Sequence, residues 1–158
     1  MGFRIGDKVI HCTFGLGEIV NIEEKIIHDQ LTNCYVVRLN DMMTWIPIDD
    51  LQQHTVRMPS PPEEFERFSA ILTRPGEALP EDRVLRKNQL LAQIRDGQLA
   101  SICEVVRDLT YFKRSKKLNG QENSILERAT NSLLTEWAYS IGISMLQARQ
   151  ELASLLAQ

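Results

Sequence analysis

The sequence has few of the features that mark secreted, membrane-spanning and nucleic-acid-coating proteins. It contains three cysteines, an odd number in distant segments, which argues against a disulfide framework and for a reducing cytoplasm. No apolar run approaches the ~18 residues of a membrane span, and no apolar segment of the secretory type follows Met1. The formal net charge of −3 excludes a protein that coats nucleic acid through bulk charge alone.

What the sequence does have is the composition of a folded protein. Its 158 residues and mass of 18.1 kDa suit one domain or two small ones. Hydrophobic residues make up 43% and charged residues 25%, close to the globular average, so a disordered chain is a poor interpretation. The pattern changes near residue 58, which predicts two domains, 1–58 and 59–158.

Residues 1–58 show the alternation and the turn residues of a small β domain. Short apolar segments predict strands over 8–12, 18–27, 34–39 and 43–48. Residues 15–17 (Gly-Leu-Gly) lack the third glycine of a dinucleotide-binding fingerprint, so we interpret them as a tight turn. Because a segment this short rarely buries enough surface for a larger sandwich, we expect a little barrel or a strongly bent sheet.

From Ser60 onward the apolar period is helical, so the whole chain belongs to the α+β class, with a helical bundle in its second half. We interpret Ser60 as a helix cap followed by proline in the first turn. A second helix is predicted over 81–95, and Asn119 and Ser144 are placed at the starts of the fourth and fifth helices. The inward positions of the second helix are Val84, Leu91 and Ile94.

Charge is segregated within the helical half. Residues 83–117 hold nine basic residues and three acidic ones, whereas residues 63–82 hold six acidic residues and two basic ones. An acidic β domain joined to helices with a basic segment suits two different partners, one of them a polyanion.

A search for catalytic or metal-binding patterns finds little. His11, Cys12, His28, Cys34 and His54 could ligate zinc, and a zinc hydrolase using His11, Cys34 and His54 is a distant alternative. None of them shows the close paired spacing of a structural zinc site. The favoured interpretation is buried cysteines in strands and surface histidines in turns. No nucleophile elbow or phosphate loop occurs, so we expect no enzyme, cofactor, metal or small-molecule substrate.

The strongest local indication of a polyanion site is the basic cluster at 113–117 (KRSKK), which follows Tyr111 and Phe112. Clustered cations release counterions from a phosphate backbone, and aromatic side chains can stack on bases. The structural alternative is a solvated loop whose basic residues favour a helix C-terminus. Trp45 is a candidate partner anchor, while Trp137 and Cys103 are assigned to the core.

Two sets of motifs resemble a known family. Residues 3–11 (FRIGDKVIH) and 15–20 (GLGEIV) are similar to the N-terminal polymerase-interacting module of the CarD/CdnL bacterial transcription regulators, which the transcription-repair coupling factor shares. Residues 104–109 (EVVRDL), 118–122 (LNGQE) and 126–129 (LERA) resemble the helical domain of the same family. The resemblance therefore spans nearly the whole chain, in the expected order.

The resemblance implies a Tudor-like β module that docks on the β subunit of RNA polymerase, with a helical domain near the promoter −10 element. Such proteins perform no bond chemistry and stabilise the open promoter complex by binding the melted state better than the closed one. The family's two basic contact positions in the β module fall on Lys25 and Trp45, and Arg38 is a third polymerase-binding candidate. A cytoplasmic, nucleoid-associated protein is implied.

The same resemblance places Arg83 where some members carry a tryptophan wedge, with Arg86 at a basic DNA-facing position and Lys87 beside it. Asn123 and Ser124 stand where other members have basic residues, so we expect weak DNA contact, confined to the polymerase complex. The alternative is a polymerase-bound adaptor whose helices hold another protein. The DNA-binding candidates are Arg83, Arg86, Lys87, Lys113, Arg114, Lys116 and Lys117.

Overall fold

The computed structural model describes residues 2–48 and 55–157, and within these ranges it contains five strands followed by five α-helices. The chain divides into two units, Met1–Pro59 and Ser60–Gln158. The first is an antiparallel, Tudor-like sheet and the second is a helical bundle, which confirms the α+β class.

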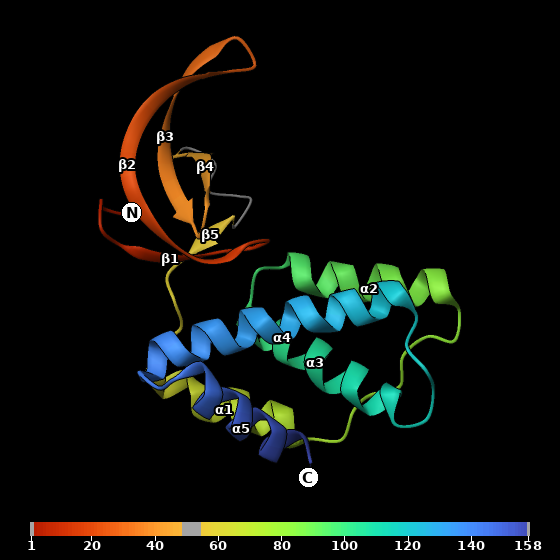
Figure 1. The fold of residues 1–158 in the computed structure, drawn as a ribbon. Helices are drawn as coiled ribbons and strands as arrows, with labels where there is room; N and C mark the ends of the chain where they lie inside the picture. Colours follow the sequence, from red (N-terminus) through yellow and green to blue (C-terminus); the bar gives the residue numbers. More distant parts are fainter. Residues whose placement is uncertain (1, 49–54, 158) are drawn as a thin grey trace. The chain divides into compact units, whose positions relative to one another are not determined.

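The sheet of the first unit has the strand order β4-β3-β2-β1-β5. Each neighbouring pair is antiparallel, and β2 and β3 form a long curved hairpin that extends beyond the other strands (Figure 1). Residues His28 and Asp29 at its tip have φ angles of 50° and 62°, the left-handed conformation that a two-residue hairpin turn requires. The strands are β1 Lys8–His11, β2 Gly15–Ile27, β3 Gln30–Leu39, β4 Met42–Pro47 and β5 Val56–Arg57.

The two faces of this sheet differ in character. Its inner face carries the core of the β unit, and its outer face carries charged side chains with Trp45. An irregularity in the pairing of β2 with β3 lies between Ile19 and Asn21, where one extra residue stands in β2. Since side chains alternate along a strand, this bulge turns Glu23 and Lys25 to the outer face. The core residues are Val9, Ile19, Tyr35, Val37, Leu39 and Ile46.

The turn predicted at residues 15–17 is wrong, because these residues begin β2 and the turn lies at Cys12–Phe14. Gly17 is required by close packing: a Cβ atom there would lie 2.7 Å from the Leu39 side chain and 2.9 Å from the Arg38 carbonyl oxygen. The expectation of surface histidines is also wrong for His11, which is buried in β1. Its Nδ1 accepts hydrogen bonds from the backbone N–H groups of Thr13 (3.0 Å) and Phe14 (3.3 Å), and these bonds shape the turn.

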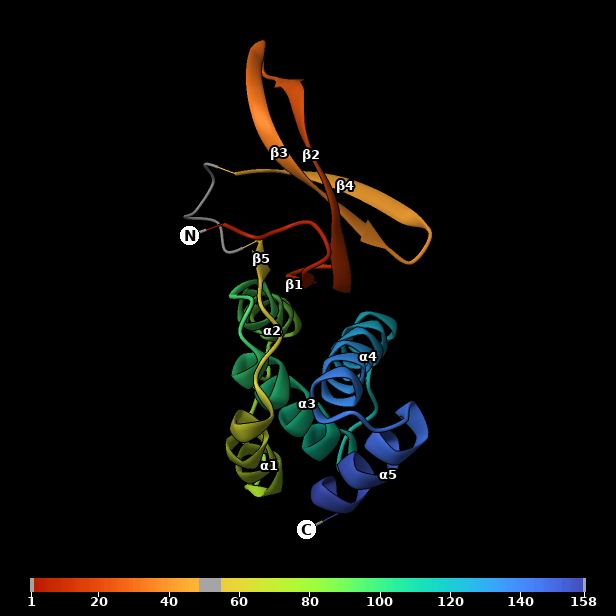
Figure 2. The ribbon, with the colours of Figure 1, turned by 90° about the vertical axis from the view of Figure 1, so that its left-hand side faces the viewer.

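The helical unit begins with a 3₁₀ turn at Pro62–Glu64 and continues as five helices. Helix α3 packs against α1, α2 and α4, and α5 packs against α1 and α4 (Figure 2). Complete capping boxes at Asn119 and Ser144 start α4 and α5 at the positions that the sequence predicts. The helices are α1 Phe65–Thr73, α2 Arg83–Arg95, α3 Leu99–Lys113, α4 Gly120–Ile141 and α5 Met145–Leu156.

Two details of the helical prediction are wrong. Ser60 caps no helix; instead its backbone N–H donates to the buried carboxylate of Glu136 at 2.8 Å, which ties the start of this unit to α4. Val84 does not face inward, since it is 60% exposed, and the buried residues of α2 are Arg86 and Leu90. A buried arginine breaks the apolar period on which the prediction relied.

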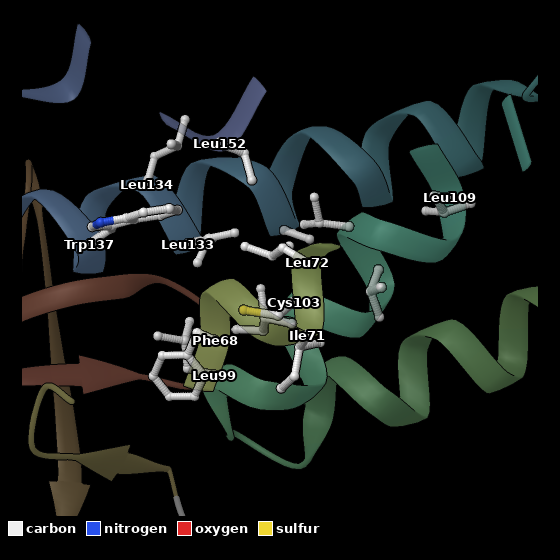
Figure 3. Close-up of a cluster of buried hydrophobic side chains, with 14 of the residues drawn as sticks. Phe68, Ile71, Leu72, Leu99, Cys103, Leu109, Leu133, Leu134, Trp137 and Leu152 are labelled. Carbon is white, nitrogen blue, oxygen red and sulfur yellow. The ribbon is translucent and has the colours of Figure 1, made fainter. Parts of the chain in front are cut away.

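The core of the helical unit lies where α4 faces α1, α3 and α5. Leu133, Leu134 and Trp137 of α4 pack into it (Figure 3). The ring centroids of Phe65 and Trp137 are 5.9 Å apart. Cys103 is fully buried there, as predicted, and burial raises the pKa of its thiol to about 12. No helix in the described ranges is both long and apolar enough to cross a membrane.

Candidate functional site

The outer face of the sheet brings together all three side chains that were predicted to contact polymerase. In the pairing of β3 with β4, Arg38 lies opposite Met43 and Val36 lies opposite Trp45. Because Arg38 and Val36 are two positions apart on β3, Arg38 and Trp45 lie on the same face of the sheet. Lys25 pairs with Thr32 of β3 and shares that face because of the bulge. We call the group Glu18, Glu23, Lys25, Arg38 and Trp45 the sheet-face surface.

Trp45 lies at the centre of contacts within the sheet-face surface. Its indole Nε1 donates to Glu23 Oε2 at 2.8 Å, and Lys25 Nζ lies 3.9 Å from the ring centroid. Both contacts reach across β3. On this face the β3 side chains Cys34 and Val36 are buried, whereas the face is otherwise exposed. Trp45 is therefore held across β3 while 36% of it remains exposed.

A charged row lies beside Trp45 on the same face. Lys8 Nζ bonds Glu18 Oε1 at 2.8 Å, and Arg38 Nη2 approaches Glu18 Oε2 at 3.5 Å. The hydrogen bond from Lys8 and the charges of Lys8 and Arg38 hold the pKa of the Glu18 carboxyl below its ordinary value. The side chain of Arg38 is 58% exposed, so its guanidinium can reach a partner.

The helical unit carries a groove between α2 and the start of α4. Two adjoining hollows of about 400 and 460 Å³ form it, and Lys87, Gly120 and Gln121 line both. Arg83 and Val84 line one end, and the apolar Leu91 and Ile125 line the other. We call this the α2–α4 groove.

The structure separates Arg86 from the other basic candidates. Its guanidinium is buried, its Nε donates to the carboxylate of Glu122, and its Nη1 donates to the carbonyls of Pro80 and Glu81 at 3.1 Å each. The Phe112 ring lies 4.9 Å from Cζ. Arg86 is thus the cation of a buried ion pair with Glu122 and does not face solvent.

Glu122 is a buried residue whose role the sequence analysis missed. Its Oε1 accepts the backbone N–H of Asn119 in the capping box of α4, and its Oε2 accepts from Arg86. Burial alone would raise the pKa of this carboxyl, but the Asn119 N–H and the charges of Arg86 and Arg83 hold it below the ordinary value. Glu122 thereby fixes the start of α4 against α2.

Arg114 and Lys116 of the basic cluster at 113–117 make contacts within the helical unit. Arg114 Nη2 donates to the carbonyl of Leu156 at 2.6 Å and so caps the end of α5. Lys116 Nζ lies 5.8 Å from the Phe112 ring centroid. Lys113, Lys116 and Lys117 are exposed and do not line the α2–α4 groove.

No group of three potential metal ligands gathers among the described residues. His28 is exposed at the tip of the β2–β3 hairpin, and Cys34 is buried beneath the outer face, where burial raises the pKa of its thiol. His54, the third member of the zinc alternative, lies outside the described residues.

Two family models match the chain, one for each unit. The CarD-like/TRCF RID domain covers residues 3–58, and the CarD C-terminal domain covers residues 68–153. The chain belongs to the CarD family. The protein is thus transcription-related, and the RID family to which its sheet belongs is associated with interaction with RNA polymerase.

A curated CarD-family relative extends this similarity over the whole protein. It is a Bacillus subtilis (strain 168) protein named "Putative transcription factor YdeB", which is 29% identical over 153 residues. The match covers 93% of this chain and 97% of YdeB. Both units of this CarD-family protein therefore have counterparts in a single protein of nearly the same length.

Proposed function

We propose that this CarD-family protein is a non-enzymatic transcription regulator of the bacterial cytoplasm. It binds the β subunit of RNA polymerase through the sheet-face surface and stabilises the open promoter complex through the helical unit near the −10 element. The observation that carries the proposal is the gathering of Lys25, Arg38 and Trp45 on one exposed face of a domain that matches the RID family. Tethering by this face raises the local concentration of the helices at DNA.

The α2–α4 groove supports a phosphate contact. Arg83 and Lys87 line it from α2, and the backbone N–H groups at the start of the long helix α4 add positive potential. Arg86 is not part of this contact, because its charge is paired inside the fold. Lys113, Lys116 and Lys117 add exposed charge elsewhere on the same unit.

The polymerase contact is tested by reversing its two exposed cations. We expect Lys25→Glu with Arg38→Glu to weaken binding to RNA polymerase by about 100-fold, since each change places like charges opposite an acidic partner surface. Affinity is measured with the full chain and polymerase core enzyme by fluorescence anisotropy. Arg4→Glu, which reverses an exposed charge outside the sheet-face surface, is the control. Undiminished binding of the double variant rejects the assignment.

The DNA contact is tested by neutralising the groove. We expect Arg83→Gln with Lys87→Gln to shorten the lifetime of the open promoter complex and to lower the salt dependence of that lifetime by about two phosphate contacts. The measurement is the decay of promoter complexes at several salt concentrations. Arg149→Gln, an exposed charge on α5, should change neither quantity. Equal lifetimes for the groove variant and the unmodified protein would remove DNA from the proposed function.

A protein adaptor is the second candidate function for the helical unit. It is favoured by Val84 and Leu85, which are adjacent on α2 and each 60% exposed. An exposed apolar pair beside a basic groove suits a protein partner as well as a nucleic acid. A footprint of the polymerase complex on promoter DNA separates the two: added protection near the −10 element supports the regulator, and an unchanged footprint supports the adaptor.

A further inference from the structure

Glu23 has no assigned part in the family resemblance, yet its carboxylate accepts the hydrogen bond that the Trp45 indole donates. We propose that Glu23 is a positioning residue of the sheet-face surface: its carboxylate holds Trp45 across β3, and the held ring keeps Lys25 in place for an acidic segment of the partner. This role rests on the proposed polymerase function, because it concerns how that surface is presented.

The strand register places Glu23 within reach of the Trp45 indole. Trp45 pairs with Val36, whereas Glu23 pairs with Cys34, the next residue of β3 on the same face. The indole therefore crosses β3 diagonally to place Nε1 2.8 Å from Glu23 Oε2. A half-exposed indole without this bond could adopt other rotamers that point away from the sheet.

Lys25 depends on the ring orientation that Glu23 sets. Its ammonium lies 3.9 Å from the ring centroid, which is favourable only while the ring face is turned toward it. Among the described residues the structure shows no carboxylate within ion-pair distance of Lys25, so its donors are available to a partner. Ordering this long side chain in advance lowers the entropy lost on binding.

The arrangement also explains how an acidic residue can stand in a surface for an acidic partner. Glu23 Oε2 accepts the indole N–H, so part of the negative charge of this carboxylate is compensated within the sheet-face surface. Arg38 is exposed on the same face and adds a second cation. We infer that the occupant is a carboxylate-bearing segment of the polymerase β subunit, since Lys25 and Arg38 offer donors suited to it.

The experiment compares Glu23→Ala, Glu23→Gln and Glu24→Ala in the full chain. Glu24 is the matched control, because it is the next residue of β2, is equally acidic and exposed, and pairs with Asn33 on the opposite face. The first measurement is the indole ¹⁵N–¹H resonance of Trp45, assigned with Trp45→Phe. The second is affinity for RNA polymerase core enzyme.

We expect Glu23→Ala to shift the Trp45 resonance and to weaken polymerase binding by about tenfold. Glu23→Gln keeps an acceptor oxygen and should restore most of both, while Glu24→Ala should change neither. An unshifted resonance in Glu23→Ala, or a loss of affinity no greater than that of Glu24→Ala, overturns the positioning role alone. Absence of polymerase binding by the unmodified protein overturns the proposed function, and the role of Glu23 in it.

Discussion

Replacing Glu122 with alanine is expected to destabilise the helical unit by about 3–5 kcal/mol, the usual cost of removing one partner from a buried ion pair. Both side chains are buried, so the Arg86 charge left behind could not be solvated. The same change deletes half of the capping box that starts α4. Denaturant unfolding of the full chain, followed by Trp137 fluorescence, measures the loss.

Two further variants test whether loss of the Arg86–Glu122 ion pair causes the destabilisation. Glu127→Ala removes an exposed carboxylate from the same helix and should change the free energy of unfolding by less than about 0.5 kcal/mol. Glu122→Gln keeps an acceptor for the Asn119 N–H but leaves Arg86 without a counter-charge. Its loss of unfolding free energy should therefore lie between those of Glu122→Ala and Glu127→Ala. A Glu122→Ala loss as small as that of Glu127→Ala would contradict the buried pair.

The pH dependence of the free energy of unfolding provides a second measurement of the Arg86–Glu122 ion pair. The pKa of the Glu122 carboxyl is lower in the folded protein than its ordinary value of 4.5, so the unfolded chain binds this proton more readily. The stabilisation is complete above the ordinary value and is lost as the pH falls through the folded pKa. In Glu122→Gln the unfolding free energy should therefore decline less steeply below pH 4.5 than in the unmodified protein.

Replacing Trp137 with alanine is expected to cost about 3–5 kcal/mol, because a large buried ring would leave a cavity that the surrounding helices fill only partly. Trp137 is 4% exposed and contacts Phe65 of α1, so the loss weakens the packing of α4 on α1. Far-UV circular dichroism during thermal and denaturant unfolding reports the change, since most of the helical signal comes from this unit.

Trp45→Ala is the control for Trp137→Ala. It removes the same side chain from the exposed face of the β unit and should leave the helical transition where it is. If Trp137→Ala lowers the free energy of unfolding by less than about 1 kcal/mol, Trp137 is not the core residue that the packing indicates.

The parts of the fold that the sequence predicted depend on neighbours within one helical turn. Asn119 and Ser144 each bond a residue three positions ahead, so a local pattern is enough to place the starts of α4 and α5. Cys103 follows the same local logic, since it sits on an apolar helical stripe.

The parts that the sequence missed depend on distant partners. The family resemblance gave Arg86 a DNA-facing position, whereas its burial depends on Glu122, which lies 36 positions away. Glu23 was missed for a related reason: simple alternation from Glu18 along β2 puts it on the inner face, and only the bulge brings it to Trp45. The polymerase-binding candidates came from the family resemblance, and the register of β3 is what places them together.

The bulge between Ile19 and Asn21 lets the β unit absorb a change of one residue at this point. Deleting Val20 would restore regular pairing of β2 with β3 and leave Glu23 opposite Cys34 and Lys25 opposite Thr32, on the face that carries Trp45. Among natural relatives, the loss of one residue should therefore be tolerated at residues 19–21 as well as at the tip of the β2–β3 hairpin, even where the side chains themselves vary.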